Sequence, residues 1–264
     1  MTPQRPAPSC VFITGATGGI GAALAKVYAG PGRTLILHGR EPDRLTRIQR
    51  ICEDQGARVD ICLLDLSDLS STLIAVTSLA DRYPIDLAIV NAGITHDTGP
   101  SGDGESWEDI ERVMTINANA AMATVSALLP SMRQRKAGQI ALISSLSAWY
   151  GLGLTPAYCA SKAALKAYGE ALGGWLAPQG IGVAVVLPGF VRSAMSDRFA
   201  GPRPFLITPD QAALRIRDGL ERDRPRISFP QPLALGMWCL ALLPAGLSRW
   251  ILGRLGYAGW PVSN

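Results

Sequence analysis

Residues 11–28 read VFITGATGGIGAALAKVY and combine the patterns of a strand, a glycine turn and a helix. Its first three residues are β-branched or aromatic and predict a buried strand, while the alanine-rich end predicts a helix. Between them lie Gly15, Gly19 and Gly21, which let the backbone come close to a ligand. A helix N-terminus at this point offers amide donors and a positive dipole end to a pyrophosphate. The stretch therefore predicts a dinucleotide-binding turn, and the alternative is an ordinary glycine turn without a ligand.

The same alternation of strand and helix continues along the chain. Short apolar runs at residues 34–37, 61–64, 86–90 and 140–143 predict further strands, and each is followed by enough residues for a helix. Such crossovers favour a parallel sheet over a sandwich or a barrel. The sequence therefore predicts an α/β fold, a Rossmann-type doubly wound parallel sheet with helices on both faces.

The end of the second strand bears on the choice of cofactor. It reads His38-Gly39-Arg40, where an acidic residue would bind the ribose hydroxyls of NAD. An arginine at this place accommodates the phosphate of NADP, so Arg40 favours NADP(H) over NAD(H). Alternatively, Arg40 and Arg44 are solvated charges paired with nearby acids. His38 receives no role from the sequence.

A hydroxyl, a phenol and an ammonium come together between residues 140 and 172. The strand at 140–143 ends at Ser144 and Ser145, where open α/β sheets bind ligands. Tyr158 and Lys162 are four residues apart on the following helix and share one face. An ammonium near a phenol favours the phenolate, so the pair could move a proton to or from an alcohol or ketone. The ordinary alternative is that a Tyr and a Lys at this spacing have no catalytic role.

Composition excludes several classes of protein. The 25 Lys and Arg residues nearly balance the 21 Asp and Glu residues, which gives a net charge of +4 and does not indicate nucleic-acid binding. The five cysteines are dispersed and have no CxxC spacing, so neither disulfides nor a metal site is predicted. The proline-rich opening lacks the apolar segment of a secretory signal. We therefore expect a cytoplasmic protein.

We expect one domain over residues 1–229 and a separate apolar extension over residues 230–264. Within the domain, a segment from about 195 to 210 is interrupted by proline and glycine and predicts a mobile lid over the substrate. Phe199, Phe205 and Leu206 could line an apolar pocket there.

The extension has an unusual composition. Residues 227–248 contain no charged side chain, and several prolines break any continuous spanning helix. Two short helices around Pro244, flanked by Arg249 and Arg254, suit a hairpin that lies in the bilayer interface. The alternatives are an oligomer contact or additional core.

Together these motifs resemble those of the classical short-chain dehydrogenase/reductase family. The resemblance covers about residues 9–195 and rests on several elements that occur in the same order. They are TGATGGIG at 14–21, Asp65, Asn-Ala-Gly at 91–93, Asn117, Ser145, Tyr-Cys-Ala-Ser-Lys at 158–162 and Pro-Gly at 188–189. The family's usual interval before Tyr158 selects Ser145 rather than Ser144.

The resemblance implies a sheet of about seven strands in the order 3-2-1-4-5-6-7 and a catalytic tetrad of Asn117, Ser145, Tyr158 and Lys162. Tyr158 would be the acid or base, and Ser145 would polarise the carbonyl. Lys162 would bind the nicotinamide ribose and lower the pKa of Tyr158, and Asn117 would hold a water that links Lys162 to solvent. The resemblance also implies a homodimer or homotetramer.

A larger set of residues is expected around the cofactor. Ser193 stands where the family often has threonine, and Thr17 stands where NADP-dependent members often have Arg or Lys, so Arg40 alone supports NADP(H). The expected cofactor-binding residues are Thr14, Gly15, Thr17, Gly18, Gly19, Ile20, Gly21, Arg40, Asp65, Leu66, Asn91, Ala92, Gly93, Tyr158, Lys162, Pro188, Gly189, Val191 and Ser193.

The sequence thus predicts an NADP(H)-dependent oxidoreductase that interconverts a ketone and a secondary alcohol. The apolar extension favours a small-molecule substrate that is lipid-like or lipid-linked, met at the cytoplasmic face of a membrane. Two alternatives remain: a cofactor-binding scaffold with little turnover that is recruited to a membrane assembly, and a member of the same family that acts on a soluble sugar or alcohol.

Overall fold

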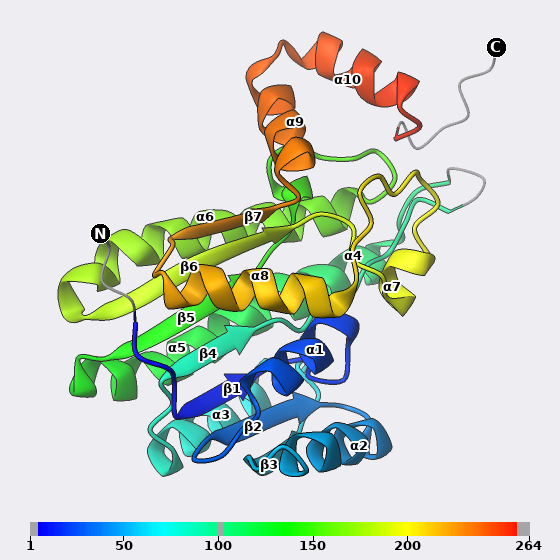
Figure 1. Ribbon diagram of the computed structural model, residues 1–264. Helices are drawn as coiled ribbons and strands as arrows, with labels where there is room; N and C mark the ends of the chain where they lie inside the picture. The colour runs from blue at the N-terminus through cyan, green and yellow to red at the C-terminus, as the bar shows by residue number, and fades with distance from the viewer. Residues whose placement is uncertain (1–4, 100–102, 258–264) are drawn as a thin grey trace.

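The computed structural model describes residues 5–99 and 103–257, which form a seven-stranded parallel sheet with helices on both faces (Figure 1). The strand order β3-β2-β1-β4-β5-β6-β7 confirms the predicted doubly wound α/β fold. The opening residues 1–4 and residues 258–264 of the predicted extension lie outside the described residues. The strands are β1 (Cys10–Ile13), β2 (Thr34–Gly39), β3 (Arg58–Leu63), β4 (Leu87–Val90), β5 (Gly138–Ile143), β6 (Ile181–Pro188) and β7 (Arg226–Phe229).

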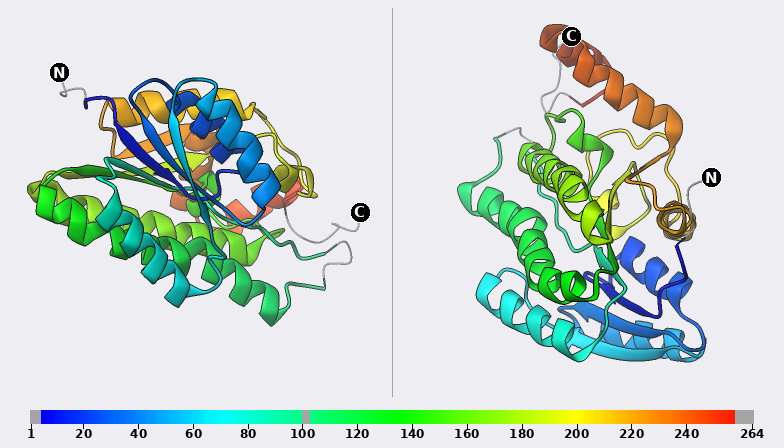
Figure 2. Two further views of the ribbon diagram at one scale, coloured as in Figure 1. Left: turned by 90° about the horizontal axis from the view of Figure 1, so that it is seen from below. Right: turned by 90° about the vertical axis from the view of Figure 1, so that its left-hand side faces the viewer.

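The helices form two layers around the sheet (Figure 2). One layer contains α1 (Gly19–Tyr28), α2 (Pro42–Glu53) and α8 (Pro209–Glu221), and the other contains α3 (Leu69–Arg82), α5 (Ala120–Arg135) and α6 (Pro156–Leu176). Successive side chains of a strand point to opposite faces, so Val11 and Ile13 pack under the first layer while Phe12 packs under the second. Both faces of the central strands are therefore buried.

The edge strand β3 begins earlier than its apolar pattern predicts. The sequence predicts a strand over residues 61–64, whereas β3 already pairs with β2 from Arg58 opposite Thr34. Only one side of an edge strand is covered by a neighbouring strand, and this one carries Arg58 and Asp60 on partly exposed positions. Apolar periodicity therefore identifies only its second half.

The sequence of residues 107–129 predicts one long helix, and the observed helix continues to Arg135. It consists of α4 (Trp107–Met114), a π-helical turn (Thr115–Asn119) and α5, and Pro130 does not end it. Among the described residues this is the helix long and apolar enough to cross a membrane, but 61% of its most apolar window is buried inside the protein. It is therefore a core helix.

The chain after β7 forms the two short helices predicted around Pro244. They are α9 (Gln231–Leu242) and α10 (Ala245–Arg254), and they project beyond the β7 edge of the sheet, while the lid helix α7 (Ala194–Asp197) lies at the carboxyl ends of the strands (Figure 1). A third apolar cluster joins them to the body, with Met237, Leu240 and Leu252 packed against the chain that follows β5. The described part of the extension therefore packs against the rest of the chain.

Candidate functional site

A cavity of about 1120 Å³ lies at the carboxyl ends of the strands, where doubly wound sheets bind ligands. It runs from the glycine turn after β1, past the segment that follows β5, to helices α9 and α10. All the predicted site residues line it except Thr14, Gly21 and Asn117, which lie behind its surface. The structure therefore brings the predicted residues to one place.

Close packing of the protein's own backbone requires glycine at two positions of the turn after β1. Gly15 has φ +67°, and a Cβ there would lie 2.9 Å from Ala92 Cα. A Cβ on Gly21 would lie 2.1 Å from the Gly15 carbonyl oxygen, so α1 can approach the turn only with glycine at this place. Helix α1 begins after Gly18 without a side-chain cap, so its first amides are available to an anion.

Thr14 and Asn91 tie β1 to β4 behind this turn. The Thr14 hydroxyl accepts hydrogen bonds from the amides of Asn91 (2.9 Å) and Ala92 (3.1 Å). The Asn91 side-chain amide donates to the carbonyls of Thr14 and Gly15, both at 3.1 Å. Thr14 therefore fixes the shape of the cofactor site without lining it.

His38 makes a contact that the sequence did not predict. Its Nδ1 accepts a hydrogen bond from the Gly15 amide at 3.2 Å, and its Nε2 lies 3.0 Å from the Leu64 carbonyl, to which it donates. Burial lowers the pKa of His38, so the ring is neutral near pH 7. The ring thus joins the glycine turn to the ends of β2 and β3. The position of a histidine at the end of β2, directly before Gly39, is the feature of the sequence that could have indicated this role.

Charged side chains surround the outer part of this half of the cavity. Arg40, Glu41 and Arg44 line it, and Arg44 pairs with Glu41 at 3.0 Å. Asp65 accepts a hydrogen bond from the Ser67 amide (3.0 Å), which lowers the pKa of its carboxyl. Arg40 pairs with no carboxylate among the described residues, so its charge is available to a ligand phosphate.

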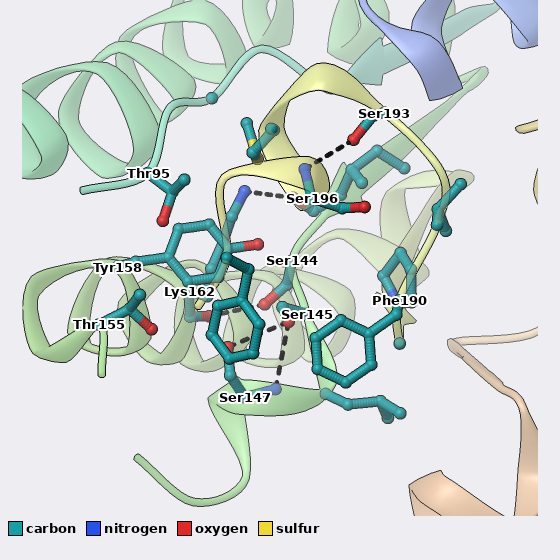
Figure 3. Close-up of a pocket in the computed structure, with 18 of the residues that line it drawn as sticks. Thr95, Ser144, Ser145, Ser147, Thr155, Tyr158, Lys162, Phe190, Ser193 and Ser196 are labelled. Atoms are coloured by element: carbon teal, nitrogen blue, oxygen red, sulfur yellow. Dashed lines mark hydrogen bonds between the residues drawn. The ribbon is translucent and has the colours of Figure 1, made fainter. Parts of the chain in front are cut away.

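The hydroxyl, phenol and ammonium predicted from the sequence lie together in the middle of the cavity (Figure 3). Lys162 Nζ donates to the Ile143 carbonyl at 2.9 Å and lies 5.6 Å from the centre of the Tyr158 ring. The two serines differ: the buried Ser144 hydroxyl donates to the Lys162 carbonyl at 2.7 Å. Ser145 Oγ accepts from the Ser147 amide (3.2 Å) and hydroxyl (3.0 Å), which leaves its own hydrogen free for a ligand.

Burial sets the protonation of this group. It raises the pKa of Tyr158 to about 12, an effect that the neighbouring Ser145 hydroxyl partly offsets. It also lowers the pKa of Lys162 to about 8. Lys162 is not among the groups that shift the pKa of Tyr158 here, so its predicted lowering of that pKa stays a prediction. Tyr158 is therefore a protonated phenol near neutral pH and can donate a proton.

Asn117 lies on the π-helical turn and is fully buried. Its side-chain oxygen accepts from the Ile94 amide (2.8 Å), while its nitrogen donates to the Ile94 carbonyl (2.9 Å) and to Ser161 Oγ (3.0 Å). All of these partners are protein groups, so the side chain joins the segment after β4 to α6. Its predicted role in holding a water stays a prediction.

The other half of the cavity is apolar and comes largely from residues that the sequence did not predict. Phe190, Phe199 and Tyr257 form an aromatic group with ring centres 5.3 Å and 6.3 Å apart. Helices α9 and α10 add aliphatic side chains such as Met237 and Leu252. Of the predicted pocket residues of the lid, Phe199 lines the cavity, whereas Phe205 and Leu206 do not line it and are 57% and 36% exposed.

No group of three or more His, Cys, Asp or Glu side chains within residues 5–99 and 103–257 could hold a metal ion. The ligands that this cavity can attract are thus an anionic dinucleotide at one end and an apolar molecule at the other.

Comparison with known proteins gives consistent matches. Residues 9–202 match the family model described as short chain dehydrogenase. A protein of Myxococcus xanthus named as an uncharacterized oxidoreductase is 33% identical over 234 residues, which cover 88% of this chain and 92% of that protein. A Drosophila melanogaster protein named dehydrogenase/reductase SDR family protein 7-like is 30% identical and covers 92% of this chain, with 79% of its own length matched.

A solved structure resembles the whole fold. The short-chain dehydrogenase from Sphingobium yanoikuyae, solved in complex with NADPH, superposes with a TM-score of 0.77 and 27% sequence identity. The match covers 94% of this chain and 97% of that chain.

Proposed function

The chain belongs to the short-chain dehydrogenase/reductase family of NAD(P)-dependent oxidoreductases, and from that premise we propose that it interconverts a ketone and a secondary alcohol on a lipid-like substrate with NADP(H). One observation carries the proposal. A single cavity places the Tyr158 hydroxyl between a polar half that ends at Arg40 and an apolar half walled by α9 and α10.

The residues of the polar half would hold the cofactor. The glycine turn and the uncapped start of α1 would receive the pyrophosphate, Asp65 and Leu66 would lie near the adenine, and Arg40 would receive the phosphate on the ribose. NADPH, when bound, supplies the hydride.

The proton chemistry falls to the chain's own side chains. In the reduction, the Tyr158 hydroxyl donates its proton to the oxygen of the ketone, and the Ser145 hydroxyl donates a hydrogen bond to the same oxygen. The hydroxyl of Ser145 is free to do so because its lone pairs already accept from Ser147. Lys162 is held by the Ile143 carbonyl at the edge of the ribose site.

A panel of carbonyl compounds tests this assignment. Purified protein would be given NADPH and matched ketones that differ only in apolar chain length, together with ketoses as the polar set. We expect turnover to rise with chain length, because the walls near Tyr158 are aliphatic and aromatic. Faster turnover of the ketoses would contradict the lipid-like substrate and favour the soluble sugar or alcohol. A failure of every carbonyl, with tight NADPH binding, would favour the scaffold.

We also propose that the protein is cytoplasmic and rests on the membrane through its C-terminal helices. Leu235, Trp238, Leu242, Leu247 and Trp250 expose 44–66% of their surface on these helices. Between residues 231 and 257 the only charged side chains are basic, which suits anionic headgroups. Co-sedimentation with anionic vesicles tests the contact, and a homodimer or homotetramer that buries these helices instead would show in the sedimentation velocity of the protein.

A further inference from the structure

The two helices after β7 each have one apolar face that lines the cavity and another apolar face that is exposed on the surface of the molecule. We define the cap as residues 231–257, which contain α9 and α10. On the inner face Leu233, Met237, Leu240, Ile251 and Leu252 line the cavity. Leu235, Trp238, Leu242, Leu247 and Trp250 form the outer face, three or four residues apart along each helix. Both the inner and the outer face of the cap are therefore apolar.

The cavity reaches the surface at the edge of the cap. Leu243 and Leu255 both line the cavity and remain 37% and 54% exposed. Leu243 directly follows α9 and Leu255 directly follows α10, so each lies where a helix of the cap ends. At these two residues the apolar interior of the cavity reaches the surface, and Arg254 lies beside the outer-face residue Trp250.

Few hydrogen bonds hold the cap in place. The Ser248 hydroxyl donates to the Leu240 carbonyl at 2.8 Å and ties α10 to α9. The Tyr257 hydroxyl donates to the Pro202 carbonyl of the lid at 2.9 Å, and the Gly153 amide donates to the Tyr257 carbonyl. The cap is thus attached to the lid at its far end, and elsewhere it rests on side-chain packing.

We propose that the cap is a portal through which an apolar chain passes from the bilayer into the cavity beside Tyr158. This inference rests on the proposed function, which supplies both the reaction and the membrane contact. The inner face binds the chain of a long-chain ketone or secondary alcohol, while the outer face lies in one leaflet with Arg249 and Arg254 at the headgroups. A second copy of the protein on the outer face would cover the mouth at Leu243 and Leu255, so a bilayer is the occupant that leaves the route open.

The two faces can be altered separately in the full-length protein. Met237→Trp adds volume to the inner face and should block the chain site. Trp238→Glu, its neighbour in sequence, places a charge on the outer face and should weaken vesicle binding. NADPH binding, measured by fluorescence at the distant polar half, serves as the folding control for both. Leu240→Phe is a milder second variant of the inner face in case Met237→Trp does not fold.

The probe is 11-(dansylamino)undecanoic acid, a fluorescent molecule with a long apolar chain, offered free in buffer or preloaded in anionic vesicles. For Met237→Trp we expect at least roughly tenfold weaker probe binding in buffer with normal vesicle sedimentation. For Trp238→Glu we expect normal binding in buffer and slower uptake from vesicles.

Three results would overturn the portal. The first is that the Met237→Trp variant binds the probe as tightly as the original protein does, or that neither protein binds the probe. The second is a Trp238→Glu protein that takes the probe from vesicles at the original rate. The third is that the original protein does not sediment with the vesicles, which would contradict the proposed membrane contact. Ketone turnover by the original protein in detergent tests the proposed reaction separately, so the failure of one can be told from the failure of the other.

Discussion

The two halves of the cavity are held together in different ways. In the polar half, Thr14, His38 and Asn91 join the ends of four strands by hydrogen bonds to backbone groups. In the apolar half, the walls are aliphatic and aromatic side chains from the lid and the cap. There the Tyr257 hydroxyl donates a hydrogen bond to the Pro202 carbonyl. A given hydrogen bond can be made by few side chains, whereas many different apolar side chains can fill the same apolar wall. The polar half should therefore respond sharply to single substitutions, and the apolar half mildly.

The largest effect is expected where the halves meet. Replacing Tyr158 by Phe removes the proton donor and leaves the ring in place, so turnover should fall by on the order of 10³-fold. NADPH affinity, measured by fluorescence titration, should stay within about twofold because the phenol is not the main cofactor contact. Tyr168→Phe on the same helix, packed away from the cavity, is the matched control. Retained turnover in Tyr158→Phe would remove Tyr158 from the mechanism.

Arg40→Ala should separate the two cofactors. The change removes a charge-assisted hydrogen bond to the ribose phosphate, so NADPH affinity should fall roughly tenfold to a hundredfold while NADH affinity stays the same. Arg47→Ala, an exposed arginine of α2 that does not line the cavity, should change neither. If NADH binds more tightly than NADPH to the original protein, the preference for NADP(H) is wrong.

The rate of reduction should depend on pH through Lys162. Its pKa is lowered to about 8 by burial, so the ammonium is charged below that value and neutral above it. Tyr158, with a pKa of about 12, remains protonated throughout this range. Reduction should therefore slow by up to about tenfold as pH rises from 7 to 9, because the charged ammonium is lost. A flat profile measured with saturating NADPH would show that the charge on Lys162 does not limit the reaction.

Substitution of His38 tests whether the shape of the phosphate site, apart from its charge, matters for cofactor affinity. His38→Leu leaves the Gly15 amide and the Leu64 carbonyl without partners, and NADPH and NADH should both bind about fivefold to tenfold more weakly. His38→Asn retains an acceptor near the Nδ1 position and should lose less. An effect on NADPH alone would instead mean that the ring acts on the ribose phosphate.

The smallest effect is expected in the apolar half. Tyr257→Phe removes the hydrogen bond to the Pro202 carbonyl and should lower the free energy of unfolding by about 1 kcal/mol, seen as a lower denaturant midpoint. NADPH affinity should not change. A large loss of cofactor binding would show that the two halves are coupled more strongly than their contacts suggest.

The polar half and the fold could be predicted from the sequence because backbone geometry requires glycines and short polar residues at fixed spacing. The turn at 14–21 and the group of Ser145, Tyr158 and Lys162 are recognisable for that reason, and the family and sheet order predicted from them are confirmed. The edge strand β3 was identified only in part because none of its residues is fully buried and Arg58 and Asp60 interrupt its apolar pattern.

The apolar half could not be predicted in the same way. Composition shows that residues 230–257 are apolar and prone to form two short helices, but not which face of each helix meets the cavity. Met237 and Trp238 are neighbours in sequence and lie on opposite faces. The role of His38 was also hidden, because its two partners, Gly15 and Leu64, are far from it in sequence and are backbone groups.

The π-helical turn at Thr115–Asn119 has a consequence for how the length of this helix can vary. Such a turn holds one residue more than the regular helix on either side of it. Deleting Ala118 would remove the extra residue and give an unbroken α-helix, in which α4 and α5 keep about their present relative rotation while the side chains of the turn change direction. Asn117 would then leave Ile94 and Ser161, although no side chain of the site had been replaced. In this part of the chain, the number of residues constrains divergence as strongly as their identity.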